Sequence, residues 1–219
     1  MPQSVELIHR RCNYRVGELS AQRFEARTVK RMLIEWGTSI NGAIVDVEST
    51  HFDPAEGELI TAGFLSKEGF TILQRVESSE ADFKAYVAKI IEGFGRPLYA
   101  FKKDCEEGFC NVAVDHDLQM RKEASFVALR DEGLLDHYNL LCDPLFGEEI
   151  PVYWTAWKKM RNPLFLSKII RHNYCCLAKE YYLKLKRIDG IDPKQIRTFV
   201  SSAAIEKKYV WPTLSVNLV

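Results

Sequence analysis

Hydrophobic and polar residues are arranged in two ways along the chain, and each arrangement predicts one kind of element. Apolar runs rich in β-branched and aromatic residues, bounded by turn-forming residues, predict strands at 42–48, 59–65, 70–73 and 98–101. Residues 67–69 suit a hairpin turn between the second run and the third. The first three runs therefore predict an antiparallel meander, with strand 42–48 at one side of it.

Apolar residues at helical spacing predict two longer elements. The first helix begins after Ser79, whose side chain can cap the main-chain amide of Asp82, and it ends near Gly93. Because this helix joins the third strand to strand 98–101, we expect a crossover connection and a parallel strand pair. The second helix is predicted at 164–187.

Three other segments show weaker helical patterns. Residues 118–129 fit a helix, and Tyr153, Trp154 and Trp157 share a helical turn. Such aromatic side chains can stack on bases, but we favour a place for them in the core. The locally basic residues 1–38 contain a further pattern between residues 20 and 36. It predicts an amphipathic helix with these residues toward the core: Phe24, Val29, Met32, Leu33 and Trp36.

The length predicts one large domain, with two small domains as the alternative, and the order of the predicted elements indicates the α/β class. We assign 1–38 to a basic N-terminal extension packed on the domain, 39–188 to the domain itself and 189–219 to a C-terminal extension. Lys and Arg number 30, as do Asp and Glu, so net charge neither indicates nor excludes a polyanionic partner. Six cysteines without a signal peptide predict free thiols in the cytoplasm. No apolar run approaches the ~20 residues of a membrane span.

Two acids end the first predicted strand. Asp46 and Glu48 alternate with Val47, so on a strand both project from one face, roughly 7 Å apart. Two neighbouring carboxylates repel each other, and a divalent cation between them relieves that repulsion best. The alternative is a strand end whose acids are simply solvated.

Further candidate ligands follow strand 98–101 and lie on the last predicted helix. Asp104, Glu106 and Glu107 stand where the chain leaves the strand, although acids also suit the first turn of any helix. His172, Cys176 and Glu180 recur every four residues and therefore share one helix face. For Glu180 we favour a solvated acid paired with Lys184, and a purely structural histidine is an equal alternative for His172.

Three motifs in this order resemble one known family. They are Asp46-Val47-Glu48-Ser49-Thr50, a strand followed by acids, and Arg171-His172-Asn173-Tyr174-Cys175-Cys176-Leu177. Together, over roughly residues 40–187, they resemble the ribonuclease H-like superfamily and its DnaQ-like 3′–5′ exonucleases. The resemblance implies a mixed sheet, with a three-strand antiparallel meander plus parallel strands, flanked by helices. It also implies hydrolysis of phosphodiester bonds at single-stranded ends of DNA or RNA.

The resemblance assigns roles to particular residues. Such enzymes hold two Mg²⁺ or Mn²⁺ ions, which activate a water molecule and stabilise the leaving 3′ oxygen. By position, Asp46 would bind both ions, Glu48 would bind one, and Glu106 would be the acid of the second motif. His172 would orient the attacking water. Asp104 takes the role of Glu106 if the alignment with the family's second motif shifts. Ser49 and Thr50 are the expected substrate contacts.

The chain also departs from the family pattern. Cys176 stands where the third motif ends in Asp, and a thiol is a poor ligand for a hard cation. His51 and Lys102 replace a usual Gly and a usual Asn. Either Glu180 substitutes for the missing acid, or three acids hold a weakened second ion, or the protein is an inactive module that binds nucleic acid or a protein. A cysteine hydrolase that uses Cys175 or Cys176 with His172 is not favoured, because no oxyanion-hole feature is visible.

Overall fold

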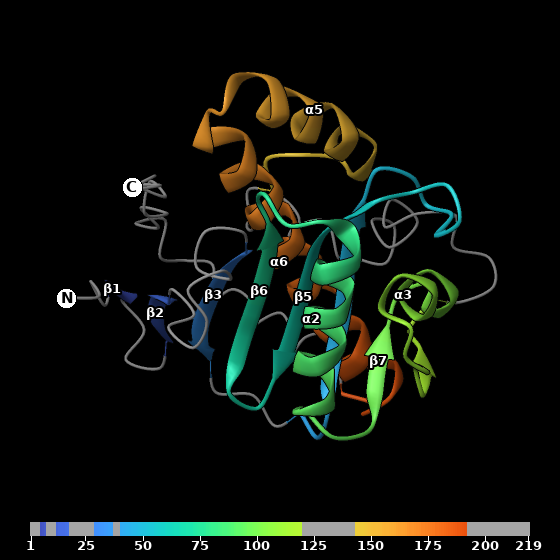
Figure 1. The fold of residues 1–219 in the computed structure, drawn as a ribbon. Helices are drawn as coiled ribbons and strands as arrows, with labels where there is room; N and C mark the ends of the chain where they lie inside the picture. Colours follow the sequence, from blue (N-terminus) through green and yellow to red (C-terminus); the bar gives the residue numbers. More distant parts are fainter. Residues whose placement is uncertain (1–4, 8–11, 18–28, 37–39, 120–142, 192–219) are drawn as a thin grey trace.

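A computed structural model of the chain describes residues 5–7, 12–17, 29–36, 40–119 and 143–191 (Figure 1). It shows a mixed sheet in the strand order β1-β2-β3-β6-β5-β4-β7-β8, with helices packed against it. The strands are β1 (Val5–Leu7), β2 (Cys12–Gly17), β3 (Val29–Trp36), β4 (Ala43–Ser49), β5 (Leu59–Ser66), β6 (Gly69–Arg75), β7 (Leu98–Ala100) and β8 (His116–Asp117). The helices are α2 (Glu80–Glu92), α3 (Lys103–Cys110), the 3₁₀ turn η2 (Gly147–Glu149), α5 (Ile150–Met160) and α6 (Pro163–Arg187).

The strand pairing confirms the α/β class and the predicted meander. β4, β5 and β6 pair antiparallel in sequence order, and β4 lies at the side of this meander. The helix α2 then leads to β7, which pairs parallel with β4, and β7 pairs parallel with β8. Strand β4 therefore lies between an antiparallel half and a parallel half of the sheet.

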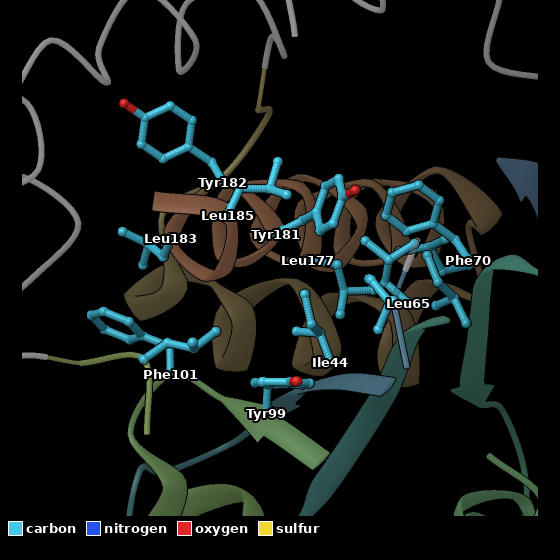
Figure 2. Close-up of a cluster of buried hydrophobic side chains, with 14 residues drawn as sticks. Ile44, Leu65, Phe70, Tyr99, Phe101, Leu177, Tyr181, Tyr182, Leu183 and Leu185 are labelled. Carbon is cyan, nitrogen blue, oxygen red and sulfur yellow. The ribbon is translucent and has the colours of Figure 1, made fainter. Parts of the chain in front are cut away.

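Alternation along β4 divides its side chains between two hydrophobic clusters. Ile44 packs with Leu177 and Tyr181 of α6 on one face of the sheet (Figure 2). Val45 packs with Phe83 of α2 on the other face. Because residues two apart on a strand share a face, every second residue of β4 from position 44 onward faces α6.

The helices form where their apolar stripes meet the sheet or each other. Ser79 caps α2 as predicted, because its side chain accepts a hydrogen bond of 3.1 Å from the Asp82 amide. Trp154 and Trp157 of α5 are buried in a third cluster together with Ile169 of α6. This burial confirms that the aromatic residues of α5 belong to the core.

The prediction of a helix between residues 20 and 36 is wrong for residues 29–36. These residues form β3, which pairs antiparallel with β6 on one side and with β2 on the other. The exposed edge of β6 offers unpaired main-chain groups, and pairing with them outweighs a local helical pattern. Residues 20–28 lie outside the described residues, as do 120–129 of the helix predicted at 118–129.

Within the described part of the chain, no helix is both long and apolar enough to cross a membrane. Where the structure describes cysteine side chains, at Cys105, Cys110, Cys175 and Cys176, none forms a disulfide.

Candidate metal-binding site

The two acids of β4 lie on the face that α6 covers. Asp46 and Glu48 are only 8% and 7% exposed, so the alternative of solvated acids does not hold. Asp46 is the register partner of Gly63 on β5. A Cβ atom at Gly63 would lie 1.9 Å from Oδ1 of Asn173, so the glycine makes room for this side chain of α6.

Asn173 is a site residue to which sequence reasoning gave no role. Its Nδ2 donates to Oδ2 of Asp46 at 2.6 Å and to the main-chain carbonyl of Asp46 at 3.2 Å. The contact fixes the orientation of the Asp46 carboxylate from a helix 127 residues further along the chain. The sequence did offer one signal, a glycine inside the apolar strand β5, since such a glycine often marks a close approach.

The acid that α3 contributes is Glu106. It is buried, whereas Asp104 is exposed, and Glu107 accepts a hydrogen bond of 2.7 Å from the Val114 amide. The parallel pairing of β7 with β4 delivers α3, which follows β7 at once, to the same edge as Asp46. Burial, and then the charge of Asp46, raises the pKa of Glu106 well above its ordinary value.

Glu180 contradicts the interpretation that we favoured from the sequence. It is 0% exposed, and Lys184 pairs with Asp189 instead, at 2.7 Å and 2.9 Å. Burial raises the pKa of Glu180, and the charges of Asp46 and Glu106 raise it further. Glu180 lies one helical turn after Cys176. Because most sides of α6 are buried in this region, the Glu180 side chain lies among the other acids and not in solvent.

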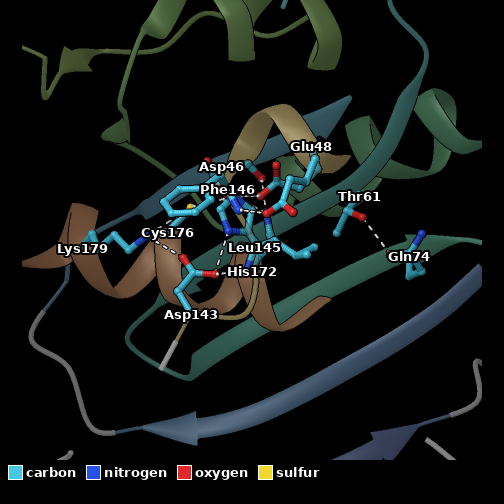
Figure 3. Close-up of polar contacts among 12 residues, drawn as sticks. Asp46, Glu48, Thr61, Gln74, Asp143, Leu145, Phe146, His172, Cys176 and Lys179 are labelled. Carbon is cyan, nitrogen blue, oxygen red and sulfur yellow. Dashed lines mark hydrogen bonds and ion pairs between the residues drawn. The ribbon is translucent and has the colours of Figure 1, made fainter. Parts of the chain in front are cut away.

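His172 is held between two carboxylates (Figure 3). Its Nδ1 lies 2.8 Å from Oδ1 of Asp143, and its Nε2 lies 3.8 Å from Oε1 of Glu48. Lys179 donates to the other oxygen of Asp143 at 2.7 Å. Although burial opposes its charge, the hydrogen bond from His172 and the charge of Lys179 lower the pKa of Asp143. Asp143 was missed because its Asp-Pro sequence reads only as a loop.

Cys176 points into this group. Its Sγ lies 3.6 Å from Nε2 of His172 and 3.9 Å from Nζ of Lys179. One donor atom each from Glu48, His172 and Cys176 lies within 4.8 Å of the others. Burial raises the pKa of the Cys176 thiol, against the effect of the neighbouring His172 and Lys179.

The cluster contains more buried acid oxygens than hydrogen-bond donors. Within the described residues, Oε1 of Glu48 and Oε2 of Glu106 have no hydrogen-bond partner, and the carboxyl group of Glu180 has none apart from the side chain of Asp46. Burial, and next the charge of Glu48, also raises the pKa of Asp46. Buried carboxylates without donors are costly as anions, so they either keep a proton or surround a cation. The arrangement is therefore suited to binding positive charge.

The residues that follow Glu48 hold the turn after β4. Ser49 Oγ donates to the carbonyl of His51 at 2.6 Å, and Thr50 Oγ1 accepts from the Glu58 amide at 2.8 Å. These bonds order the loop at the rim of the site. Contact of Ser49 and Thr50 with a substrate stays a prediction.

In comparisons with protein-family models, curated proteins and solved structures, nothing matches this chain. The function of the site is therefore inferred from its own residues.

Proposed function

We propose that the chain is a metal-dependent nuclease of the ribonuclease H-like type, a 3′–5′ exonuclease on single-stranded ends of DNA or RNA. The strand order supports the type. Strands β4 to β8 lie in the order β6-β5-β4-β7-β8, with an antiparallel meander joined to parallel strands. Helices α2 and α3 occupy the connections within the parallel half, and α6 covers the acidic face. This is the arrangement that the resemblance in the three motifs implies.

The observation that carries the proposal is the convergence of four buried carboxyl groups from three elements, close enough for their charges to act on one another. Asp46 and Glu48 come from β4, Glu106 from α3 and Glu180 from α6. Their oxygens without donors fit Mg²⁺ or Mn²⁺, because hard divalent cations bind carboxylate oxygen in preference to other protein groups. Glu180 would take the place of the acid that Cys176 replaces. When bound, such ions stabilise the charge that develops on the phosphate and favour ionisation of the attacking water.

The other polar residues prepare the site for hydrolysis. Asp143 holds Nδ1 of His172, so the second ring nitrogen is directed toward Glu48, where it can orient a water molecule. Asn173 keeps the Asp46 carboxylate in one orientation. Lys179 balances the charge of Asp143.

The test compares acids inside and outside the cluster on end-labelled single strands of DNA and of RNA. With Mn²⁺ present, Asp46→Asn and Glu106→Gln should each reduce cleavage by about 100-fold or more, as expected when a group that stabilises the transition state is removed. Asp104→Asn is the matched control, since Asp104 is an exposed acid of the same helix as Glu106. Equal cleavage by all four proteins would assign the activity to a contaminant and contradict the proposal.

The presence of Cys176 favours a second candidate, an inactive module that binds nucleic acid or a protein. In that case the wild type should retain single strands in a binding assay without shortening them, with or without Mn²⁺. A Mn²⁺-dependent rise in melting temperature that Asp46→Asn removes would speak for the metal site.

A further inference from the structure

We propose that Glu48, His172 and Cys176 form a site for a transition-metal ion of the Zn²⁺ class, in addition to the Mg²⁺ or Mn²⁺ function of the acids. A thiolate and an imidazole are ligands that Zn²⁺ prefers and that Mg²⁺ does not. Glu48 and His172 belong to both sites, but Cys176 belongs only to this one. The inference therefore depends on the thiol of Cys176 and does not require nuclease activity.

The spacing of the donor atoms fits a tetrahedral ion. With bond lengths of about 2.1 Å to nitrogen and about 2.3 Å to sulfur, the two atoms of a tetrahedral zinc site lie about 3.6 Å apart. Nε2 of His172 and Sγ of Cys176 are 3.6 Å apart. Oε1 of Glu48 lies 3.8 Å from the same nitrogen, so a movement of a few tenths of an ångström would complete the set. All three donors lie within 4.8 Å of one another.

The surroundings of His172 supply a second observation. Metal-binding histidines usually donate their other ring nitrogen to a carboxylate, which fixes the ring and its tautomer. Oδ1 of Asp143 is this acceptor, 2.8 Å from Nδ1 of His172, and Nε2 is thereby directed toward Glu48 and Cys176. Lys179 holds the same carboxylate at 2.7 Å and lies near the sulfur, where its charge favours a thiolate.

The third observation is the carboxylate of Glu48. It is more than nine-tenths buried, and its Oε1 has no hydrogen-bond partner within the described residues. This oxygen is the atom that faces Nε2 of His172. Three protein ligands leave the fourth position of a tetrahedral ion open, as in catalytic rather than structural zinc sites.

The same residues also allow a different interpretation, in which Cys176, His172 and Asp143 act as a nucleophile, its base and the residue that orients the base. Reactive thiols are partly exposed, whereas Cys176 is buried. The unpaired oxygen of Glu48 would also have no purpose in such a triad. The metal site accounts for all of these groups.

Cobalt titration tests the proposal, because Co²⁺ replaces Zn²⁺ and gives a near-ultraviolet absorption band only when a thiolate binds it. We expect the reduced, metal-free full-length protein to develop this band with one equivalent of Co²⁺ and to lose it when Zn²⁺ is added. Cys176→Ser should abolish the band, while Cys175→Ala, which changes the adjacent buried thiol, should keep it. Asp143→Asn should weaken Co²⁺ binding by about 10- to 100-fold, as loss of a partner of a metal-binding histidine does.

The outcomes separate this inference from the nuclease proposal. Asp46→Asn should lose Mn²⁺-dependent cleavage but keep the cobalt band, and Cys176→Ser should lose the band whatever its cleavage rate. Absence of the band from the wild type, or its persistence in a folded Cys176→Ser protein, would overturn the metal site. Rapid alkylation of Cys176 that Zn²⁺ does not slow would also overturn it and favour the nucleophile. Circular dichroism verifies the fold, and Asp143→Asn provides a second test if Cys176→Ser does not fold.

Discussion

The two faces of strand β4 are built from alternate residues of the same seven-residue segment, yet one face is apolar and the other carries acids. Val45 and Val47 face α2 and join an apolar cluster with Phe83. Asp46 and Glu48 face α6 and are buried just as deeply among ionisable groups. The comparison shows that burial alone does not define the core. Burial of the apolar face stabilises the fold, whereas burial of the charged groups on the other face lowers stability.

This contrast has a measurable consequence for mutations. Removing a buried side chain from the α2 face should cost stability and leave the chemistry of the site unchanged. Removing a buried charge from the α6 face should cost chemistry and leave stability unchanged or improved.

The largest effect on stability is expected on the apolar face. Phe83→Ala removes a fully buried ring, and such changes cost about 3–5 kcal/mol because a cavity remains. Urea unfolding measures the loss. Lys89→Ala, at an exposed position of the same helix, should change stability by no more than about 0.5 kcal/mol. A similar loss in both variants would mean that α2 does not pack against the sheet as described.

An intermediate effect on stability is expected at Gly63, where β5 and α6 approach each other closely. In Gly63→Ala the new methyl group would overlap Asn173 and press on Leu177, which lies 2.8 Å away, at a cost of about 1–3 kcal/mol. Asn173 would also lose its hold on Asp46, so Mn²⁺ should stabilise this variant less than the wild type. Melting temperatures with and without Mn²⁺ measure both effects. Gly93→Ala is the control, because its nearest neighbour lies at 3.3 Å and its φ is negative.

The smallest expected effect on stability is a gain and not a loss. The folded state raises the pKa of Glu180, so it binds a proton more tightly than the unfolded chain does. Above the ordinary carboxyl pKa of about 4, metal-free wild type therefore loses stability as pH rises toward the folded value, by at most about 1.4 kcal/mol per pH unit. Glu180→Gln lacks this loss, so in the presence of a chelator its advantage over the wild type should grow with pH.

Urea unfolding at several pH values tests this expectation, with the exposed acid Glu92 changed to Gln as the control. An advantage of Glu180→Gln that is constant with pH would show that folding does not raise the pKa of Glu180. Addition of Mn²⁺ should reverse the order, because the wild type then gains more than the variant.

Local patterns were sufficient to predict the elements around the site. Strands β4 to β7 and helices α2 and α6 follow from apolar runs and helical spacing, and the motif residues Asp46, Glu48, Glu106 and His172 are all buried. Their roles stay a prediction. Strand β3 could not be predicted, because its pairing depends on the free edge of a strand that comes later in the chain.

The remaining parts of the site depend on tertiary contacts. Periodicity placed Glu180 on the face of His172 but could not show that Lys184 would pair with Asp189. Asp143 had no signal at all, because only the path of the chain into α5 brings a loop acid to the imidazole.

The link between Asp143 and His172 joins residues 29 positions apart, across the whole of η2 and α5. Without the docking of η2 and α5, Asp143 would not reach His172, and the imidazole would be free to rotate. For the proposed function, the positioning of His172 therefore depends on a segment that contributes none of the four carboxyl groups.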